Sequence, residues 1–224
     1  MERKEYSAGA VKMSFWFIEF RKVVQLLHDG KSMDEIKALA QSENIFAAPT
    51  ALRSNQIYST VAGRIRSLDQ SFIPFFLSGD LATQKLYALI AAMAYDTLFF
   101  DFVYEVIREK MIVGSNELTD SDVRIFFKDK QQQNKKVAGW TDATLVRLGR
   151  CYKTMLYEAG IIDKSKTVRT ILKPIFDPEL SRWLEQNDMA IYEKALTERF
   201  GKDLNTMVSG DKWVDFMNRS ADKG

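Results

Sequence analysis

Three cations recur at three-residue spacing in the segment VRLGRCYK: Arg147, Arg150 and Lys153. At roughly 100° per residue of a helix, they fall in an arc nearly opposite the apolar side chains of the same segment. Those apolar residues are Leu145, Leu148, Tyr152, Met155, Leu156 and Ala159. A helix with one buried and one cationic face can neutralise a row of phosphates, so the segment predicts a surface that binds a polyanion. The alternative is a solvated basic face with no ligand.

The basic residues of the chain are concentrated in the same region. The whole protein has 32 Lys and Arg against 30 Asp and Glu over 224 residues, a net charge of +2. Residues 124–176 alone hold 12 basic and 4 acidic residues, and the parts before and after them are net acidic. We therefore predict an anion-binding region in the middle of a mildly acidic chain. The candidate contacts are Lys135, Lys136, Arg147, Arg150, Lys153, Lys164, Lys166, Arg169 and Lys173, with Arg53, Arg64 and Arg66 from an earlier basic helix.

Residue types that usually carry catalysis are sparse. The chain has one histidine, His28, and one cysteine, Cys151, which are too few for a zinc site or a histidine-based triad. Neither a phosphate-binding loop nor a dinucleotide fingerprint occurs. Three acids spaced four apart, Asp101, Glu105 and Glu109, favour a solvated stripe or contact with Arg108 over a bound metal. We expect a protein without enzymatic activity, cofactor or metal, and the single cysteine is typical of a reducing compartment.

The first half of the chain is expected to be helical throughout. Ser32 and Glu35 have the spacing of a capping box, Gly30 ends the helix before it, and Asp80 introduces the helix after SGD. The expected helices cover residues 8–29, 33–43, 51–68 and 81–111.

The last of these helices contains the most membrane-like stretch of the sequence. Residues 86–107 are long enough to cross a bilayer, but Asp96, Asp101 and Glu105 interrupt them. Each acid would cost about 2.5–3.5 kcal/mol at mid-membrane. The stretch therefore predicts a buried core helix and a protein that does not enter a membrane.

The basic region has the expected order of a winged helix-turn-helix. Thr119 and Asp122 begin a short helix near 120–128, residues 128–139 resemble a loop, and Thr141 caps the cationic helix, which runs to about 158. Residues 167–176 predict one or two short strands, and Lys164, Ser165 and Lys166 would then form the wing. We expect a mainly α protein, a helical bundle plus a winged-helix-like region over about 119–176 with one short β-hairpin.

Residues 115–123 are the preferred boundary between two domains, 1–114 and 115–224. Asp177 and Pro178 begin a helix, and two or three more helices follow to the C-terminus. Their aromatic residues can close the core or, alternatively, dock on another protein as part of an adaptor; they include Trp183, Tyr192, Phe200, Trp213 and Phe216.

The succession of segments resembles the BrxA family, accessory proteins of BREX bacteriophage-exclusion systems. The resemblance is carried by YSAGA near the start, ALRSNQIYSTVAGRIRSL (51–68) and the apolar segment 80–111. It continues through WTDATLVRLGRCYKTMLYEAGII (140–162) and ILKPIFDPELSRWLEQN (171–187), and it is weakest after residue 190.

The resemblance implies a cytoplasmic, mainly helical protein that binds double-stranded DNA. It also implies work beside other BREX components, among them methyltransferase and ATPase-like partners. The family's helical fold is similar to that of NusB antitermination proteins, which keeps RNA as a possible ligand. No catalytic motif follows from the family.

Overall fold

A computed structural model describes residues 4–197, which fold mainly into helices with one two-stranded antiparallel sheet. The helices are η1 (Gly9–Lys12), α1 (Phe17–His28), α2 (Met33–Ser42), α3 (Ala51–Ile65), α4 (Phe72–Ser78), α5 (Leu81–Tyr95), α6 (Thr97–Phe102), η2 (Val103–Ile107), α7 (Arg108–Ile112), α8 (Asp120–Gln133), α9 (Lys135–Ala138), α10 (Asp142–Ala159), α11 (Pro178–Gln186) and α12 (Ala190–Lys194). The strands are β1 (Glu117–Thr119) and β2 (Val168–Thr170). The mainly helical fold expected from the sequence is confirmed.

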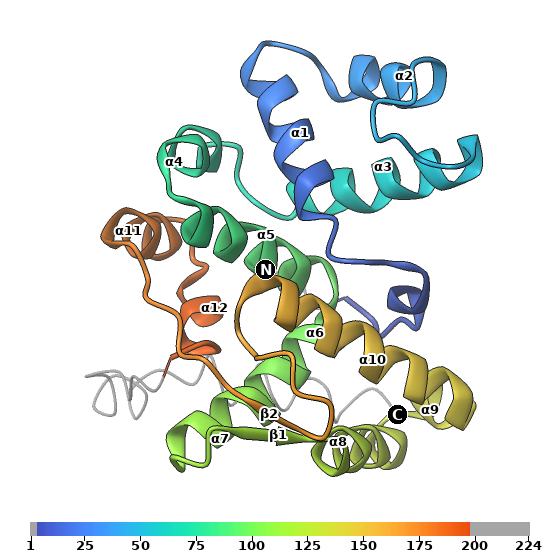
Figure 1. Ribbon diagram of the computed structural model, residues 1–224, viewed down its shortest axis with the longest axis vertical. Coiled ribbons are helices and arrows are strands. Elements are labelled where there is room, and N and C mark those ends of the chain that lie inside the picture. Colours follow the sequence, from blue (N-terminus) through green and yellow to red (C-terminus); the bar gives the residue numbers. More distant parts are fainter. Residues whose placement is uncertain (1–3, 198–224) are drawn as a thin grey trace.

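Two groups of helices lie at opposite ends of the molecule (Figure 1). Helices α1, α2 and α3 lie at one end, and α7, α8, α9 and both strands lie at the other. Helix α10 packs on α5, on η1 and on α8, so it joins the basic region to the N-terminal half. The hydrophobic core is one continuous cluster from Ala10 to Leu196. The division near residue 115 stays a prediction.

Local capping signals begin several helices where the sequence places them. The Ser32 hydroxyl accepts from the Glu35 N–H and the Glu35 carboxylate accepts from the Ser32 N–H, a complete capping box for α2. Thr119 and Asp122 form the same box at α8. The side chains of Thr50, Asp80, Thr141 and Asp177 cap α3, α5, α10 and α11.

The expected helix over 8–29 is wrong in its first half. It is split into the short turn η1 and helix α1, and Trp16 between them adopts a left-handed backbone with φ 50°. The Trp16 ring is buried, and the Arg53 guanidinium lies over it, 4.8 Å from the ring centroid. Tertiary packing thus breaks a segment whose local pattern is helical. Gly30, with φ 87°, follows the end of α1 as expected.

The expected long helix over 81–111 is also broken, at Asp96. The Asp96 carboxylate accepts from the N–H groups of Leu98 and Phe99, each at 3.1 Å, and so caps α6 after α5 has ended. No single helix among residues 4–197 is long and apolar enough to cross a membrane. The pair Leu81–Tyr95 and Thr97–Ile112 passes by length and composition, but it is bent by 113°, and nearly all of α5 is buried.

The loop expected over 128–139 is mostly helical. Helix α8 continues to Gln133, and α9 follows after Asn134, whose side chain accepts from the N–H groups of Lys136 and Val137. Val137 is fully buried and anchors this short helix. The polar composition therefore reflects an exposed helix surface.

The two strands come from separate parts of the chain. Strand β2 lies in the expected range, and its partner β1 comes from the segment 115–123, which the sequence predicts as a domain boundary, with Leu118 opposite Arg169. A further antiparallel bridge joins Ile162 to Ile171, and the Leu172 N–H donates to the Ile161 carbonyl at 2.8 Å. Residues 163–167 are thus a tight turn between two paired stretches.

Helices α11 and α12 close the core on the side of α4 and α5. Trp183 is almost fully buried against Phe72 and Tyr87, and its indole N–H donates to the Ser71 hydroxyl at 2.9 Å. Tyr192 packs edge-on against Phe100. These two aromatics therefore belong to the core, whereas Phe200, Trp213 and Phe216 lie outside the described residues.

Candidate nucleic-acid interface

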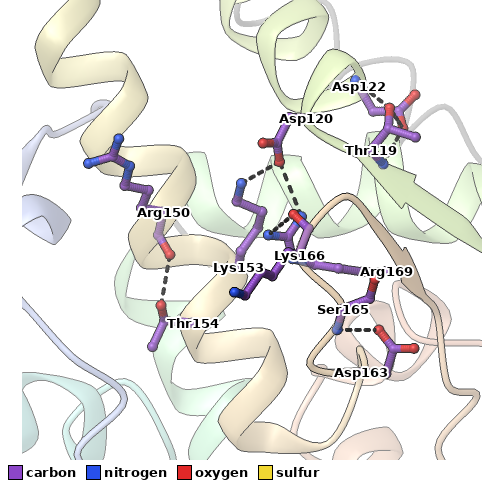
Figure 2. A network of polar contacts seen from close by, with 10 residues as sticks. All are labelled: Thr119, Asp120, Asp122, Arg150, Lys153, Thr154, Asp163, Ser165, Lys166 and Arg169. Atoms are coloured by element: carbon purple, nitrogen blue, oxygen red, sulfur yellow. Dashed lines mark hydrogen bonds and ion pairs between the residues drawn. The ribbon is translucent and has the colours of Figure 1, made fainter.

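Helix α10 presents two arginines to solvent. The expected buried face is confirmed, with Leu148, Tyr152 and Leu156 fully buried. Arg147 and Arg150 lie on exposed positions, and neither guanidinium has a hydrogen bond or ion pair to another residue within 4–197. Figure 2 shows Arg150 pointing away from the polar network beside it. These two side chains are available to an anion.

Gly149 sets the spacing between α10 and α8. A Cβ atom at Gly149 would lie 2.6 Å from Cγ1 of Val123, which is closer than side-chain carbons approach. The glycine therefore lets the two helices pack closely just where α10 carries Arg147 and Arg150.

Lys153 is not the freely exposed cation that the sequence predicts. Its ammonium is 2.6 Å from Oδ1 of Asp120, and its side chain is only 13% exposed. The same oxygen accepts from the Arg169 guanidinium at 3.1 Å, and that side chain is 15% exposed. Figure 2 shows both cations converging on Asp120. The hydrogen bond from Lys153 is the main cause that lowers the pKa of Asp120, with Arg169 adding to it.

The turn between the paired stretches carries two further exposed cations. The Asp163 carboxylate accepts from the Ser165 N–H at 3.0 Å, and the Arg169 guanidinium donates to the Lys166 carbonyl at 3.2 Å. These bonds use the backbone of the turn, and the side chains of Lys164 and Lys166 stay exposed. The turn thus has a defined conformation and a basic tip.

The remaining basic residues of this region differ in their surroundings. Lys135 is exposed, and Lys136 pairs with Glu5 at 3.0 Å on the surface. Lys173 is exposed on the extended segment after β2. Lys130 is only 5% exposed, so it contributes to the sequence charge without reaching the surface.

Lys130 belongs to a buried ion pair that the sequence did not indicate. Its ammonium is 2.6 Å from Glu105 Oε1 and 3.7 Å from Asp101 Oδ2, and Asp101 also accepts from the Tyr6 hydroxyl at 2.5 Å. Asp101 is buried, which contradicts a solvated acidic stripe at that position. The alternative, contact with Arg108, is made by Glu109, whose Oε1 lies 3.0 Å from the Arg108 guanidinium, whereas Glu105 pairs with Lys130 of α8, 25 residues away.

Of the three arginines in the α3 region, Arg64 is buried and Arg53 is held by neighbouring residues at a half-buried position. Arg64 is 3% exposed, and its guanidinium donates to the Phe15 carbonyl at 2.6 Å and to the Met155 sulfur at 3.5 Å. Burial lowers the pKa of Arg64 to about 10. Arg53 donates to the Lys12 carbonyl and to Gln56 beneath its stacking on Trp16. A buried guanidinium cannot meet a duplex, so the prediction for Arg64 is corrected; Arg66 is exposed.

No metal centre appears in the described part of the chain. Within residues 4–197, no group of three or more His, Cys, Asp and Glu side chains has the arrangement to hold a metal ion. The Cys151 thiol is free, and partial burial raises its pKa.

These features define a small, mainly helical protein with one short sheet and with exposed cations on α10 and on the turn at 163–167. The BrxA family model matches residues 4–188, and the chain belongs to the BrxA family. The BREX protein BrxA of Bacillus cereus (strain H3081.97) is 39% identical over 192 residues, which cover 86% of this chain and 96% of that protein. The family resemblance noted in the sequence is thereby confirmed.

A solved structure shares the fold at lower sequence identity. The crystal structure of an uncharacterized protein from Magnetospirillum magneticum superposes with a TM-score of 0.74 at 20% identity. The match covers 88% of this chain and all of that one. At this identity the likeness shows the fold alone.

Proposed function

We propose that this BREX-system protein binds double-stranded DNA without catalysis, mainly through phosphate contacts, as a part of phage defence. Membership of the BrxA family gives the defence context. The observation that carries DNA binding is a set of four exposed cations on two adjoining elements: Arg147 and Arg150 on α10, and Lys164 and Lys166 on the turn.

The order of elements supports the same proposal. Strand β1 is followed by α8, by the short α9, by α10, which packs closely on α8, and by two stretches paired through Ile162 and β2 around a basic turn. This is the order of a winged helix-turn-helix, in which a helix and a wing contact the duplex. Contacts made by arginine and lysine to phosphates fix position and carry little sequence preference.

Electrophoretic mobility shifts with a duplex of random sequence test the proposal. Four phosphate contacts predict a slope of log K against log salt of about −3.6, because each releases roughly 0.9 of a counterion. Single-stranded DNA and duplex RNA run in parallel would reveal a different preferred ligand. Absence of any shift at 50 mM salt with all three would refute nucleic-acid binding.

An adaptor role between defence subunits is the second candidate, and one observation favours it. Ile175 is 91% exposed and Leu172 is 45% exposed on the extended segment between β2 and α11. Exposed apolar side chains of this kind would be covered if another protein packed on the segment. Co-purification with the other BREX subunits, compared between the wild type and Ile175→Asp, tests this role; equal recovery of every subunit would remove its support.

A further inference from the structure

We propose that Asp120 is a positioning residue for DNA binding. Its carboxylate holds the basic turn, residues 163–167, against α8 and α10, and so presents Lys164 and Lys166 at a fixed place relative to Arg147 and Arg150. The inference rests on the proposed function, because it assigns a role within the same surface.

The geometry joins three elements at a single oxygen atom. Oδ1 of Asp120, at the first position of α8, accepts from Lys153 of α10 at 2.6 Å and from Arg169 of β2 at 3.1 Å. The two cations are 33 and 49 residues away in the chain. Figure 2 shows the carboxylate between α10 and the strand that leaves the turn. Neither cation can shift without giving up this shared acceptor.

Arg169 also holds the backbone of the turn. One of its terminal nitrogens meets Asp120, and the other donates to the Lys166 carbonyl at 3.2 Å. The Asp163 N–H donates to the Thr170 carbonyl at 3.0 Å at the base of the turn. The backbone is thereby tied at both ends, while Lys164 and Lys166 point their side chains to solvent. A pre-ordered turn loses less conformational entropy when it docks on a phosphate backbone.

Whether removal of the Asp120 carboxylate weakens or strengthens duplex binding distinguishes a positioning residue from a merely repulsive charge. The carboxylate is 54% exposed, whereas the two cations beneath it are largely covered. As a negative charge on a phosphate-binding surface, Asp120 would weaken binding, and its removal would strengthen it. As a positioning residue it supports binding, and its removal weakens it although the surface becomes more positive.

We call the contacts of Asp120 with Lys153 and Arg169, together with that of Arg169 with the Lys166 carbonyl, the clamp. Two variants of the full chain test the clamp, with a matched control. Asp120→Asn keeps the size but replaces the charged acceptor by a neutral amide oxygen that holds the two cations less strongly, and Arg169→Lys keeps the charge but loses the planar fork that reaches two acceptors. Asp142→Asn is the control, because Asp142 is an exposed acid at the first position of α10 with no side-chain partner in the described residues. It changes the net charge as Asp120→Asn does and leaves the clamp intact.

Duplex binding should fall roughly tenfold in Asp120→Asn and in Arg169→Lys, since two lysines must then be ordered on docking. The salt slope should become shallower by up to about 1.8, the share of two phosphate contacts. Asp142→Asn should bind as well as the wild type or more tightly. In the absence of DNA, amide exchange across residues 161–172 should be faster in the two clamp variants and unchanged in the control.

The outcomes distinguish a failure of the clamp inference from a failure of the proposed function. A wild type that binds no duplex refutes the function and, with it, the DNA role of Asp120. A wild type that binds, with Asp120→Asn tighter and matching Asp142→Asn, shows that Asp120 acts only as a repulsive charge and overturns the inference. Unchanged exchange across the turn in Arg169→Lys overturns it as well, and this readout remains if Asp120→Asn fails to fold.

Discussion

At the scale of single residues, similar cations have different roles because of their partners. Arg147 and Arg150 reach solvent, Lys153 and Arg169 share Asp120, and Arg64 is buried. Helical periodicity predicted which side of α10 is apolar, but it could not predict Asp120 as a partner. That partner lies 33 residues from Lys153, and no local pattern records a contact over such a separation.

Arg64 should be required for stability and dispensable for DNA binding. Arg64→Leu leaves the buried Phe15 carbonyl without its donor, which costs about 1–3 kcal/mol. Urea unfolding measures the loss, and Arg21→Leu, at an exposed arginine of α1, should change stability by less than about 0.5 kcal/mol. If Arg64→Leu instead remained as stable as the wild type but lost duplex binding, the assignment of Arg64 to the interior would be wrong.

At the scale of elements, the helix starts were largely predictable and the breaks were not. Ser32 with Glu35 and Thr119 with Asp122 are local signals, and both boxes form. The interruption at Asp96 lies within a continuous apolar pattern, so periodicity suggested one helix where the chain turns by 113°. Strand β1 has three residues, too few for alternation to show, and only its pairing with β2 defines it.

Close packing of α8 on α10 should depend on the absence of a side chain at residue 149. Gly149→Ala places a Cβ against Val123, and overpacking of this kind costs about 1–3 kcal/mol, partly offset by the higher helix propensity of alanine. Urea unfolding of Gly149→Ala, Val123→Ala and the double variant forms a double-mutant cycle. The double variant should be more stable than the sum of the two single changes predicts. If the losses in free energy of unfolding simply add, the methyl group introduced at residue 149 does not clash with Val123.

At the scale of the whole molecule, the N-terminal segment and the basic region form one packed unit. Tyr6 reaches Asp101, Glu5 reaches Lys136, and the buried Lys130 lies between Asp101 and Glu105. The Lys136–Glu5 and Lys130–Asp101 contacts span residue 115, and composition does not record such contacts; the division into two domains near that residue stays a prediction. The basic region is therefore packed against residues of the N-terminal half, including Glu5 and Asp101.

Lys130 should stabilise the molecule without contributing to its salt-dependent binding. Lys130→Met removes the ammonium beside Asp101, whose side chain is 4% exposed, and breaking an ion pair to a buried carboxylate costs about 3–5 kcal/mol. Lys128→Met is the matched control on the exposed side of the same helix, and its effect should lie within about 0.5 kcal/mol. Chemical denaturation compares the three proteins. A Lys130→Met variant as stable as the control would contradict the buried pair.

The salt dependence of duplex binding by Arg147→Glu/Arg150→Glu tests the central claim most directly. Both positions are exposed on α10, and glutamate is nearly as good a helix former as arginine, so the variant should stay folded. Lys31→Glu/Lys37→Glu, near α2 at the other end of the molecule, makes the same charge change. We expect the α10 variant to lose detectable binding, or to lose about 1.8 units of slope where binding persists, and the control to retain most of both. A folded α10 variant that binds the duplex with the wild-type affinity and slope would contradict the claim.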